Sequence, residues 1–322
     1  MDAIYQFGIN LIHSLQTLSP ALDGLMEGVT FIGRIEFYLV VVPFIYWSMD
    51  RRIGVRALLI LTYTEFTAYS FKQLLHQPRP YWISDVKALS VEPSYGIPSS
   101  HASNTLAVIG YLAAQVKKNW FWLVTILLLF LIGISRLYLG VHFPQDVLFG
   151  WLIGFTVLWG ILKWETKVRD WLVGKPLSVQ IGLGFLDSIF IVLIGFIIRL
   201  ILNGMPDPAS YSSYSADART ITHFFTLAGT LFGTISGYAL MRQYARFDPK
   251  GTWGKRIIRY VVGIFGVLVI FYGLDLLFAA ITADETTLGY ILRYIRYAFV
   301  PFWMTFLAPW IFLKTRLADR ED

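Results

Sequence analysis

The feature that most constrains this chain is a series of long apolar stretches separated by short polar segments. A helix needs about 20 mostly apolar residues to cross the hydrocarbon core of a bilayer. The sequence therefore predicts an all-α, polytopic integral membrane protein with about nine transmembrane helices. The expected spans are 29–48, 56–77, 101–116, 119–139, 145–163, 178–202, 220–241, 258–281 and 288–313. The third of these is short and begins with polar residues, so its assignment depends on context.

The composition agrees with a membrane protein and excludes several other classes. Hydrophobic residues make up 56% of the 322 residues and charged residues only 15%, whereas soluble domains carry roughly 25% charge. This balance excludes disordered, collagenous and nucleic-acid-binding proteins. The chain has no cysteine, so disulfides, thiolate metal sites and cysteine nucleophiles are excluded as well.

The N-terminal segment 3–17 is amphipathic rather than uniformly apolar. Its apolar positions Ile4, Phe7, Leu11 and Leu15 recur at helical spacing. We expect an interfacial helix here, lying along the membrane surface rather than spanning it.

Basic residues give the expected orientation of the spans. When the loop after the first span is placed in the cytoplasm, the cytoplasmic segments hold 18 of the 27 Lys and Arg residues. This bias predicts an outer N-terminus and a cytoplasmic C-terminus. The nine outer cations are Arg34, Lys72, Arg79, Lys87, Arg136, Arg199, Arg219, Arg293 and Arg296.

Three clusters of polar residues lie at the outer ends of the expected spans, all before residue 170. We therefore expect two parts, a core in 1–170 with the N-terminal helix and about five spans, and a C-terminal membrane module in 171–322 with about four spans and no assigned role. The clusters are Lys72, Arg79 and Pro80; Pro98, Ser99, Ser100 and His101; and Ser135, Arg136, His142 and Asp146.

Each cluster taken alone has an ordinary structural explanation. Lys72 and Arg79 would be interfacial cations that extend toward the headgroups. His101 would be a polar residue at a helix start, and His142 with Asp146 would be a structural pair on one helical face. Together they place three cations, two histidines, one carboxylate and two hydroxyls at the same membrane face. Such a set predicts a phosphate site with a nucleophile and a second acid.

The spacing of these residues resembles the type 2 phosphatidic acid phosphatase superfamily, which also includes bacterial acid phosphatases and vanadium haloperoxidases. Its signature is Lys, six residues, Arg-Pro; then Pro-Ser-X-His; then Ser-Arg, five residues, His, three residues, Asp. All spacings match, and the one departure is Ser100 where many members have Gly. The second motif also resembles the sphingosine-phosphate phosphatase branch. The resemblance covers about residues 1–165.

The resemblance implies a role for each motif residue. His142 would attack phosphorus to form a phosphohistidine, with Asp146 orienting its ring. His101 would protonate the leaving group and then activate water. The resemblance also implies that the family uses neither metal nor cofactor. The remaining motif residues would bind the phosphate; they are Lys72, Arg79, Ser99, Ser100 and Arg136.

The expected position of the site favours a lipid substrate, because a headgroup can enter between helix ends while its acyl chains stay in the bilayer. We expect an extracytoplasmic site in a bacterial inner membrane, or a lumenal one in the endoplasmic reticulum. Polyprenyl pyrophosphate, phosphatidate-like lipids and sphingoid phosphates all remain open as substrates, as does the oligomeric state. The alternatives are a phosphotransferase between lipids, and a phosphatase core fused to a lipid transport module.

Further ionisable residues lie within the expected spans. Glu65 is seven residues before Lys72, and we expect a structural hydrogen bond there. Asp275 and the pair Arg293 and Arg296 lie in the outer halves of the last two spans. An ion pair is the simpler explanation for these three residues, and a second site for an anionic headgroup is the alternative.

Overall fold

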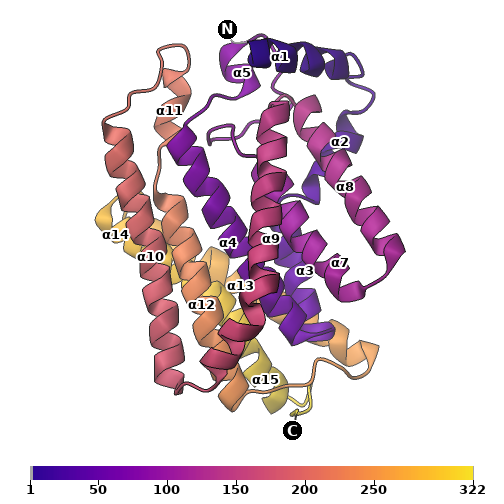
Figure 1. Cartoon of the computed structure of the whole chain (residues 1–322). Helices are drawn as coiled ribbons and strands as arrows, with labels where there is room; N and C mark the ends of the chain where they lie inside the picture. The colour runs from indigo at the N-terminus through magenta and orange to yellow at the C-terminus, as the bar shows by residue number, and fades with distance from the viewer. Residues whose placement is uncertain (1–2, 322) are drawn as a thin grey trace. The chain divides into compact units, whose positions relative to one another are not determined.

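The computed structural model describes residues 3–321, and within them all side chains except those of residues 215 and 216. This part of the chain is helical and contains no β-strand, only an isolated bridge between Phe247 and Arg320. The all-α class is therefore confirmed. Figure 1 labels the helices in chain order.

The first half of the chain contains nine α-helices and one π-helical segment in the described residues. Pro80 and Pro144 each occupy a first helical position, where a missing N–H costs nothing. The elements are α1 (Ala3–Gln16), α2 (Asp23–Phe31), α3 (Ile35–Ser48), α4 (Arg51–Leu75), α5 (Pro80–Ile83), α6 (Ser100–Asn104), η1 (Thr105–Ile109), α7 (Gly110–Val116), α8 (Asn119–Tyr138) and α9 (Pro144–Val173).

The second half consists mainly of long apolar helices. Pro301 lies near the end of α14, and a π-helical segment follows it directly. The elements are α10 (Leu177–Asn203), α11 (Ser212–Ala218), α12 (Thr222–Tyr244), α13 (Trp253–Ala279), α14 (Thr287–Phe302), η2 (Trp303–Leu307) and α15 (Ala308–Lys314).

Six helical segments in the described residues are long and apolar enough to cross a membrane, or seven if the bent pair α2 and α3 forms one span. The six are α8, α9, α10, α12, α13 and the segment Thr287–Lys314. The expected count of nine is not confirmed. The difference lies at 56–77 and 101–116. Helix α4 carries Glu65 and Lys72 among its apolar residues, and the continuous helical run from α6 to α7 is only 17 residues long.

The chain divides into two compact units, each built from separate segments of the sequence. Unit 1 comprises Met1–Tyr38, Tyr63–Ile161 and Phe196–Thr220, and unit 2 comprises Leu39–Thr62, Leu162–Gly195 and Ile221–Asp322. All three polar clusters belong to unit 1. The segment 196–220, beyond the boundary expected near residue 170, also belongs to it.

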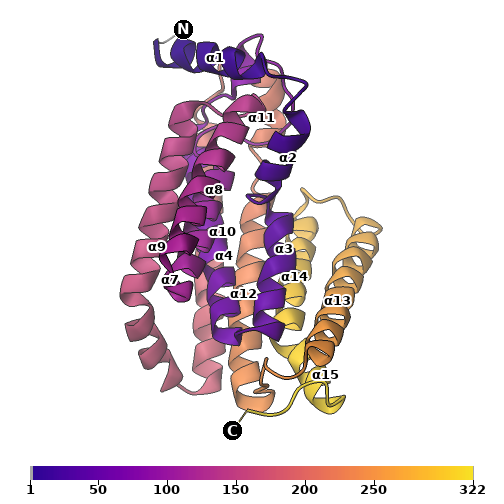
Figure 2. The same ribbon diagram turned by 90° about the vertical axis from the view of Figure 1, so that its right-hand side faces the viewer.

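Within unit 1, α1 lies crosswise at the ends of α8 and α9 (Figures 1 and 2). Ile9 and Ile12 are buried against Val86 and Phe143, next to the third polar cluster. The helix expected in 3–17 is therefore present. Its other side leaves Ile4 and Phe7 each 65% exposed, as an interfacial helix requires.

Within unit 2, α12 and α13 both pack against α14, and Figure 2 shows α13 beside α14. Residues on α13 remain largely exposed, among them Val261, Phe265 and Leu276. An apolar helix with an exposed apolar side is typical of a surface that faces lipid rather than water.

Candidate active site

The histidine of the third cluster is held in a defined orientation. His142 lies just before α9, and its Nδ1 is 3.2 Å from Oδ2 of Asp146 in the first turn of that helix. The same Oδ2 accepts a hydrogen bond from the backbone N–H of Phe143 at 2.9 Å. Both side chains are buried, with 1–2% of their surface exposed. Asp146 thus fixes the ring and favours a proton on Nδ1.

The other ring nitrogen of His142 faces a cation. Nη1 of Arg79 lies 3.3 Å from Nε2 of His142. A guanidinium has only donors, so Nε2 must accept and is therefore unprotonated. Burial, followed by the positive charges of Arg79 and Lys72, lowers the pKa of His142 well below its ordinary value. The ring is therefore neutral, with the lone pair of Nε2 directed at the guanidinium of Arg79.

Arg79 is held by the loop between the first two clusters. Its Nε donates to the carbonyl of Ser94 at 2.5 Å and its Nη1 to the carbonyl of Val141 at 2.8 Å. Nη2 donates to Oγ of Ser94 at 3.0 Å and to the carbonyl of Tyr95 at 3.1 Å. Burial lowers the pKa of Arg79 from its ordinary value. The side chain is fully buried and fixed at the histidine.

Lys72 reaches the same loop from the last turn of α4. Its Nζ donates to the carbonyls of Tyr95 and Gly96 at 3.0 and 3.2 Å. The described residues show no ion pair at Nζ, so two carbonyls hold an ammonium group that is 3% exposed. This leaves the third donor of Nζ for an anion.

Arg136 lies in the last turn of α8 and is fully buried. Its Nη1 donates to Oγ1 of Thr30 at 2.8 Å, its Nη2 contacts the carboxylate of Glu92, and its Nε has no hydrogen-bond partner. Buried donors without partners are rare in folded proteins and often mark a position that a ligand fills.

The second cluster opens α6. The Nε2 of His101 and the Oγ of Ser99 are buried without a hydrogen-bond partner. Ser100 differs, because its hydroxyl donates to Oε1 of Glu65 at 3.2 Å. Its backbone N–H is therefore the group available to a ligand at this position.

Two glycines bring the second and third clusters together. Gly150 and Gly154 lie one turn apart on α9, against the backbone of α6. A Cβ at Gly150 would lie 2.5 Å from the carbonyl oxygen of Ser99, and one at Gly154 would lie 2.5 Å from that of Ser103. This close approach lets the backbone N–H of Ser99 donate to the carbonyl of Asp146 at 2.9 Å.

Several residues of the site were not identified from the sequence. Glu92 contacts Arg136, and its Oε2 lies 4.0 Å from Nη2 of Arg79. Burial alone would raise the pKa of Glu92, but the charges of Arg136 and Arg79 hold it well below its ordinary value. The carboxylate is therefore ionised and lies where two guanidinium groups meet.

The expected structural role of Glu65 is confirmed. Its Oε2 accepts a hydrogen bond from Nδ2 of Asn104 at 2.7 Å, and its Oε1 accepts the one from Ser100. Tyr95, whose carbonyl holds two of the cations, is anchored through its hydroxyl to Asp207 at 2.8 Å. Arg219 donates to both at 3.1 and 2.7 Å. The segment 196–220 thus supports the site.

All three clusters predicted from the sequence therefore meet in unit 1, and comparison with known proteins gives them a family. Residues 53–170 match the PAP2 superfamily. Residues 225–320 match a region described as the transmembrane extension of PAP2 superfamily phosphatases. The chain belongs to the PAP2 superfamily. The resemblance to type 2 phosphatidic acid phosphatases is confirmed, and the chain is an integral membrane protein.

Individual PAP2 relatives match over most of the chain. Lipid phosphate phosphatase delta of Arabidopsis thaliana is 27% identical over 82% of this chain and 65% of its own length. Sphingosine-1-phosphate phosphatase 1 of Rattus norvegicus is 25% identical over 88% of this chain and 70% of its own length. The chain spans between about half and two thirds of the length of the first curated relatives that it matches.

One solved structure that matches is a transmembrane PAP2-type phosphatidylglycerolphosphate phosphatase from Bacillus subtilis. It is 24% identical, with a TM-score of 0.45 over 52% of this chain and 89% of that chain.

Proposed function

We propose that the chain is a lipid phosphatase that hydrolyses a phosphate monoester or pyrophosphate of a lipid through a phosphohistidine on His142. The observation that carries this proposal is the orientation of His142 between Asp146 and Arg79, with Nδ1 at the carboxylate and Nε2 at the guanidinium. A neutral imidazole with its unprotonated nitrogen at a cation is suited to attack a phosphoryl group that the cation takes up in its place.

The reaction proceeds in two steps. Nε2 of His142 forms a bond to phosphorus while the bond to the leaving oxygen breaks, and His101 gives that oxygen a proton. In the second step His101 takes a proton from water, the hydroxide attacks phosphorus, and the P–N bond breaks to release phosphate. The buried, unpartnered Nε2 of His101 is the atom that would meet both oxygens.

Three cations hold the phosphoryl oxygens in both steps. Arg136 and Lys72 each have a donor without a partner, and Arg79 would turn the Nη1 donor that now faces Nε2 of His142 to the phosphoryl group. Together they would stabilise the charge that the transition state spreads over these oxygens. The hydroxyl of Ser99 and the backbone N–H of Ser100 add neutral donors. Within the described residues, no group of three or more His, Asp or Glu could hold a metal ion, so the proposal assigns charge stabilisation to the cations.

The substrate class rests on the membrane setting. Six helical segments in the described residues are suited to spanning a bilayer, so the phosphate of a lipid can reach the site while its chains remain in the membrane. Relatives differ in their substrates, since one that matches about half of the chain is rat glucose-6-phosphatase 3. We assign a lipid phosphate here, without choosing among polyprenyl, glycerol-based and sphingoid backbones.

A trapping experiment tests the nucleophile. With an aryl phosphate, whose leaving group needs little protonation, His101→Ala should still load phosphate onto the protein and release it slowly. His142→Ala should form no phosphoenzyme and lose at least about 10⁴-fold in kcat, as removal of a nucleophile does elsewhere. The measurement is acid-labile, base-stable ³²P on the protein, with His13→Ala on α1 as the control. Label that accumulates in His142→Ala would exclude His142 as the nucleophile.

The outer location of the site is tested by labelling. The chain has no cysteine, so Lys87→Cys and Lys250→Cys each introduce a single thiol at an exposed position. We expect an impermeant maleimide to label the first variant in intact cells and the second only after permeabilisation. The reverse pattern would show that the site faces the cytoplasm.

A further inference from the structure

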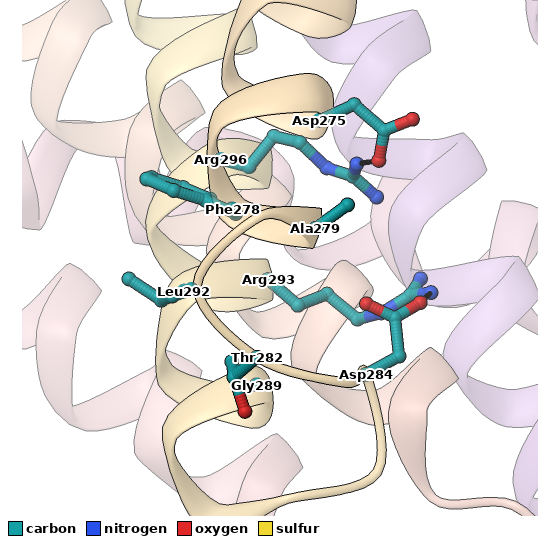
Figure 3. Close-up of a pocket in the computed structure, with 9 residues that line it drawn as sticks. All are labelled: Asp275, Phe278, Ala279, Thr282, Asp284, Gly289, Leu292, Arg293 and Arg296. Carbon is teal, nitrogen blue, oxygen red and sulfur yellow. Dashed lines mark hydrogen bonds and ion pairs between the residues drawn. The ribbon is translucent and has the colours of Figure 1, made fainter.

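A second charged pocket lies in unit 2, between the end of α13, the start of α14 and the loop that joins them. Figure 3 shows its four charged residues: Asp275 on α13, Asp284 in the loop, and Arg293 and Arg296 on α14. The expected ion pair is present, because Nη1 of Arg296 contacts the carboxylate of Asp275. Arg293 forms a second pair, with its Nη2 2.6 Å from Oδ2 of Asp284.

These pairs are more than structural ion pairs, because they leave buried donors unused. The Nε atoms of Arg293 and Arg296 are both buried without a hydrogen-bond partner. The side chain of Arg296 is 7% exposed and that of Arg293 is 18% exposed. Two neighbouring guanidinium groups with free buried N–H groups form a position for an acceptor with several oxygens, such as a phosphate.

The guanidinium groups are fixed before any ligand arrives. That of Arg296 lies over the rings of Tyr297 and Phe271, 4.9 and 5.3 Å from their centroids. Nη1 of Arg293 donates to Oγ1 of Thr226 on α12 at 3.2 Å. Contacts with three helices thus restrict both side chains, and this lowers the entropy lost on binding.

The two carboxylates lie further out than the two cations. The side chains of Asp275 and Asp284 are 51% and 62% exposed. The pocket is therefore positive inside and negative at its mouth, with no net charge. A ligand that carries both signs, with its anion deeper than its cation, satisfies this arrangement.

Exposed aliphatic side chains flank the pocket. Leu276 and Ile281 lie on the side of α13 and the loop, and Leu288 and Ile291 on that of α14, with between 46% and 75% of their surface exposed. In a protein that crosses a bilayer, such a surface is covered by acyl chains. The occupant of the pocket is therefore a membrane lipid rather than a soluble phosphate.

We propose that this pocket binds the headgroup of a zwitterionic phospholipid with a primary ammonium group. The phosphate binds between Arg293 and Arg296, and the ammonium binds Asp275 and Asp284. An anionic headgroup would leave both carboxylates beside a phosphate, with like charges in contact. A choline headgroup cannot donate hydrogen bonds to the carboxylates. This site is independent of the proposed phosphatase chemistry in unit 1.

Lipid retention by the full-length protein tests this assignment. The protein is purified in detergent, incubated with equal amounts of dioleoyl phosphatidylethanolamine, phosphatidylcholine and phosphatidylglycerol, and analysed by native mass spectrometry. We expect phosphatidylethanolamine to be retained about tenfold over phosphatidylcholine, as one or two charge-assisted hydrogen bonds provide. Equal retention of the two, or preferential retention of phosphatidylglycerol, would overturn the proposal.

Two double variants test whether the preference for phosphatidylethanolamine arises in this pocket. Arg293→Gln with Arg296→Gln should remove the preference, whereas Arg199→Gln, at an exposed arginine of α10, should keep it. Asp275→Asn with Asp284→Asn alters only half-exposed side chains, so the fold should persist. It should turn the preference toward phosphatidylglycerol, because the pocket is then positive throughout. A preference that survives both double variants would place the lipid elsewhere.

A soluble competitor separates the two sources of the same headgroup. O-phosphoethanolamine carries both charges but no acyl chains. At the concentration of the lipid it should leave phosphatidylethanolamine bound, because the flanking aliphatic surface contributes nothing to its affinity. Displacement at that concentration would overturn the assignment to a membrane lipid.

Discussion

The cations of the two charged sites are held by different groups. In unit 1, Arg136 contacts the carboxylate of Glu92 and Arg79 lies 4.0 Å from it, whereas Lys72 has no carboxylate contact among the described residues. Lys72 and Arg79 donate mainly to carbonyl groups. In unit 2, Arg293 and Arg296 each have a carboxylate of their own. Both sites bury guanidinium groups with unpartnered Nε atoms, in Arg136, Arg293 and Arg296. The two sites differ in whether each cation is paired with a carboxylate and in which other side chains lie beside the cations.

This difference separates a site for reaction from a site for binding. Carbonyl groups hold Lys72 and Arg79 without neutralising them, so their charge remains available to a phosphoryl group. Two histidines lie with them, one with a free Nε2 and one oriented by a carboxylate. The unit 2 pocket has matched charges, none of its lining residues is a histidine, and both of its carboxylates are paired with arginines. It is therefore suited to binding alone.

The largest effect that the comparison predicts is loss of activity when a unit 1 cation is removed. Alanine at Lys72, Arg79 or Arg136 should lower kcat/KM at least about 100-fold, because one donor to a transition-state oxygen is worth about 3 kcal/mol. Alanine at Lys87, an exposed cation outside the site, should change it less than about threefold. Phosphate release from a lipid phosphate is the measurement. Equal losses at all four positions would indicate a diffuse electrostatic surface rather than a site.

A smaller effect of opposite sign is expected at Glu92. Its ionised carboxylate contacts Arg136 and lies near Arg79, so an incoming phosphate must displace it or bind beside it. Glu92→Gln keeps the shape and removes the charge. We expect inhibition by inorganic phosphate or vanadate to strengthen about tenfold, since relief of one like-charge contact is worth about 1.4 kcal/mol.

The control for this variant is Asp85→Asn, which removes an exposed carboxylate from the same loop. It should leave the inhibition constants unchanged. A weaker inhibition in Glu92→Gln, together with a lower melting temperature, would show that Glu92 maintains the arrangement of the arginines instead of competing with the anion.

The residues proposed for catalysis were easier to find in the sequence than their surroundings. The three motifs have fixed spacings, and each lies at the end of a helix, so the sequence alone predicts that His101, His142 and Asp146 lie close together. Glu92 belongs to the irregular loop between α5 and α6, and its position depends on tertiary contacts that no spacing records. The only signal in the sequence for a role of Glu92 in the site is that it lies between the motif that contains Arg79 and the motif that contains Arg136.

The number of spans was harder to predict for a related reason. Helix α4 brings Glu65 and Lys72 to the site, and α6 begins with Ser100 and His101. Polar residues that serve the site reduce the mean hydropathy of the helices that carry them, so these helices give the weakest span signal. Two further helices were easier to predict, because α13 is strongly apolar and α14 is amphipathic. The ion pair between them was predictable because Asp275 and Arg296 were expected at the same membrane face.

The smallest effect predicted by the comparison is a change in pH dependence. Burial and the charges of Arg79 and Lys72 place the pKa of His142 well below 6.5, its ordinary value. His142 then stays neutral down to that lower pKa, and its protonation reduces activity only in more acidic solution. Between pH 8 and pH 6, kcat should therefore fall less than about twofold, whereas a histidine with an ordinary pKa would cause a loss of about fourfold.

Removal of one cation should move this acidic limb. Arg79→Gln takes away the charge nearest to Nε2 of His142, so the pKa of His142 should rise and the residual activity should decline at a higher pH than in the wild type. Lys87→Gln should leave the profile in place. The second ionisation of a phosphate monoester, near pH 6, is measured separately by ³¹P NMR and divided out. A wild-type limb centred near pH 6.5 after this correction would mean that the unit 1 cations do not act on His142, and the distinction between the two sites would then rest on geometry alone.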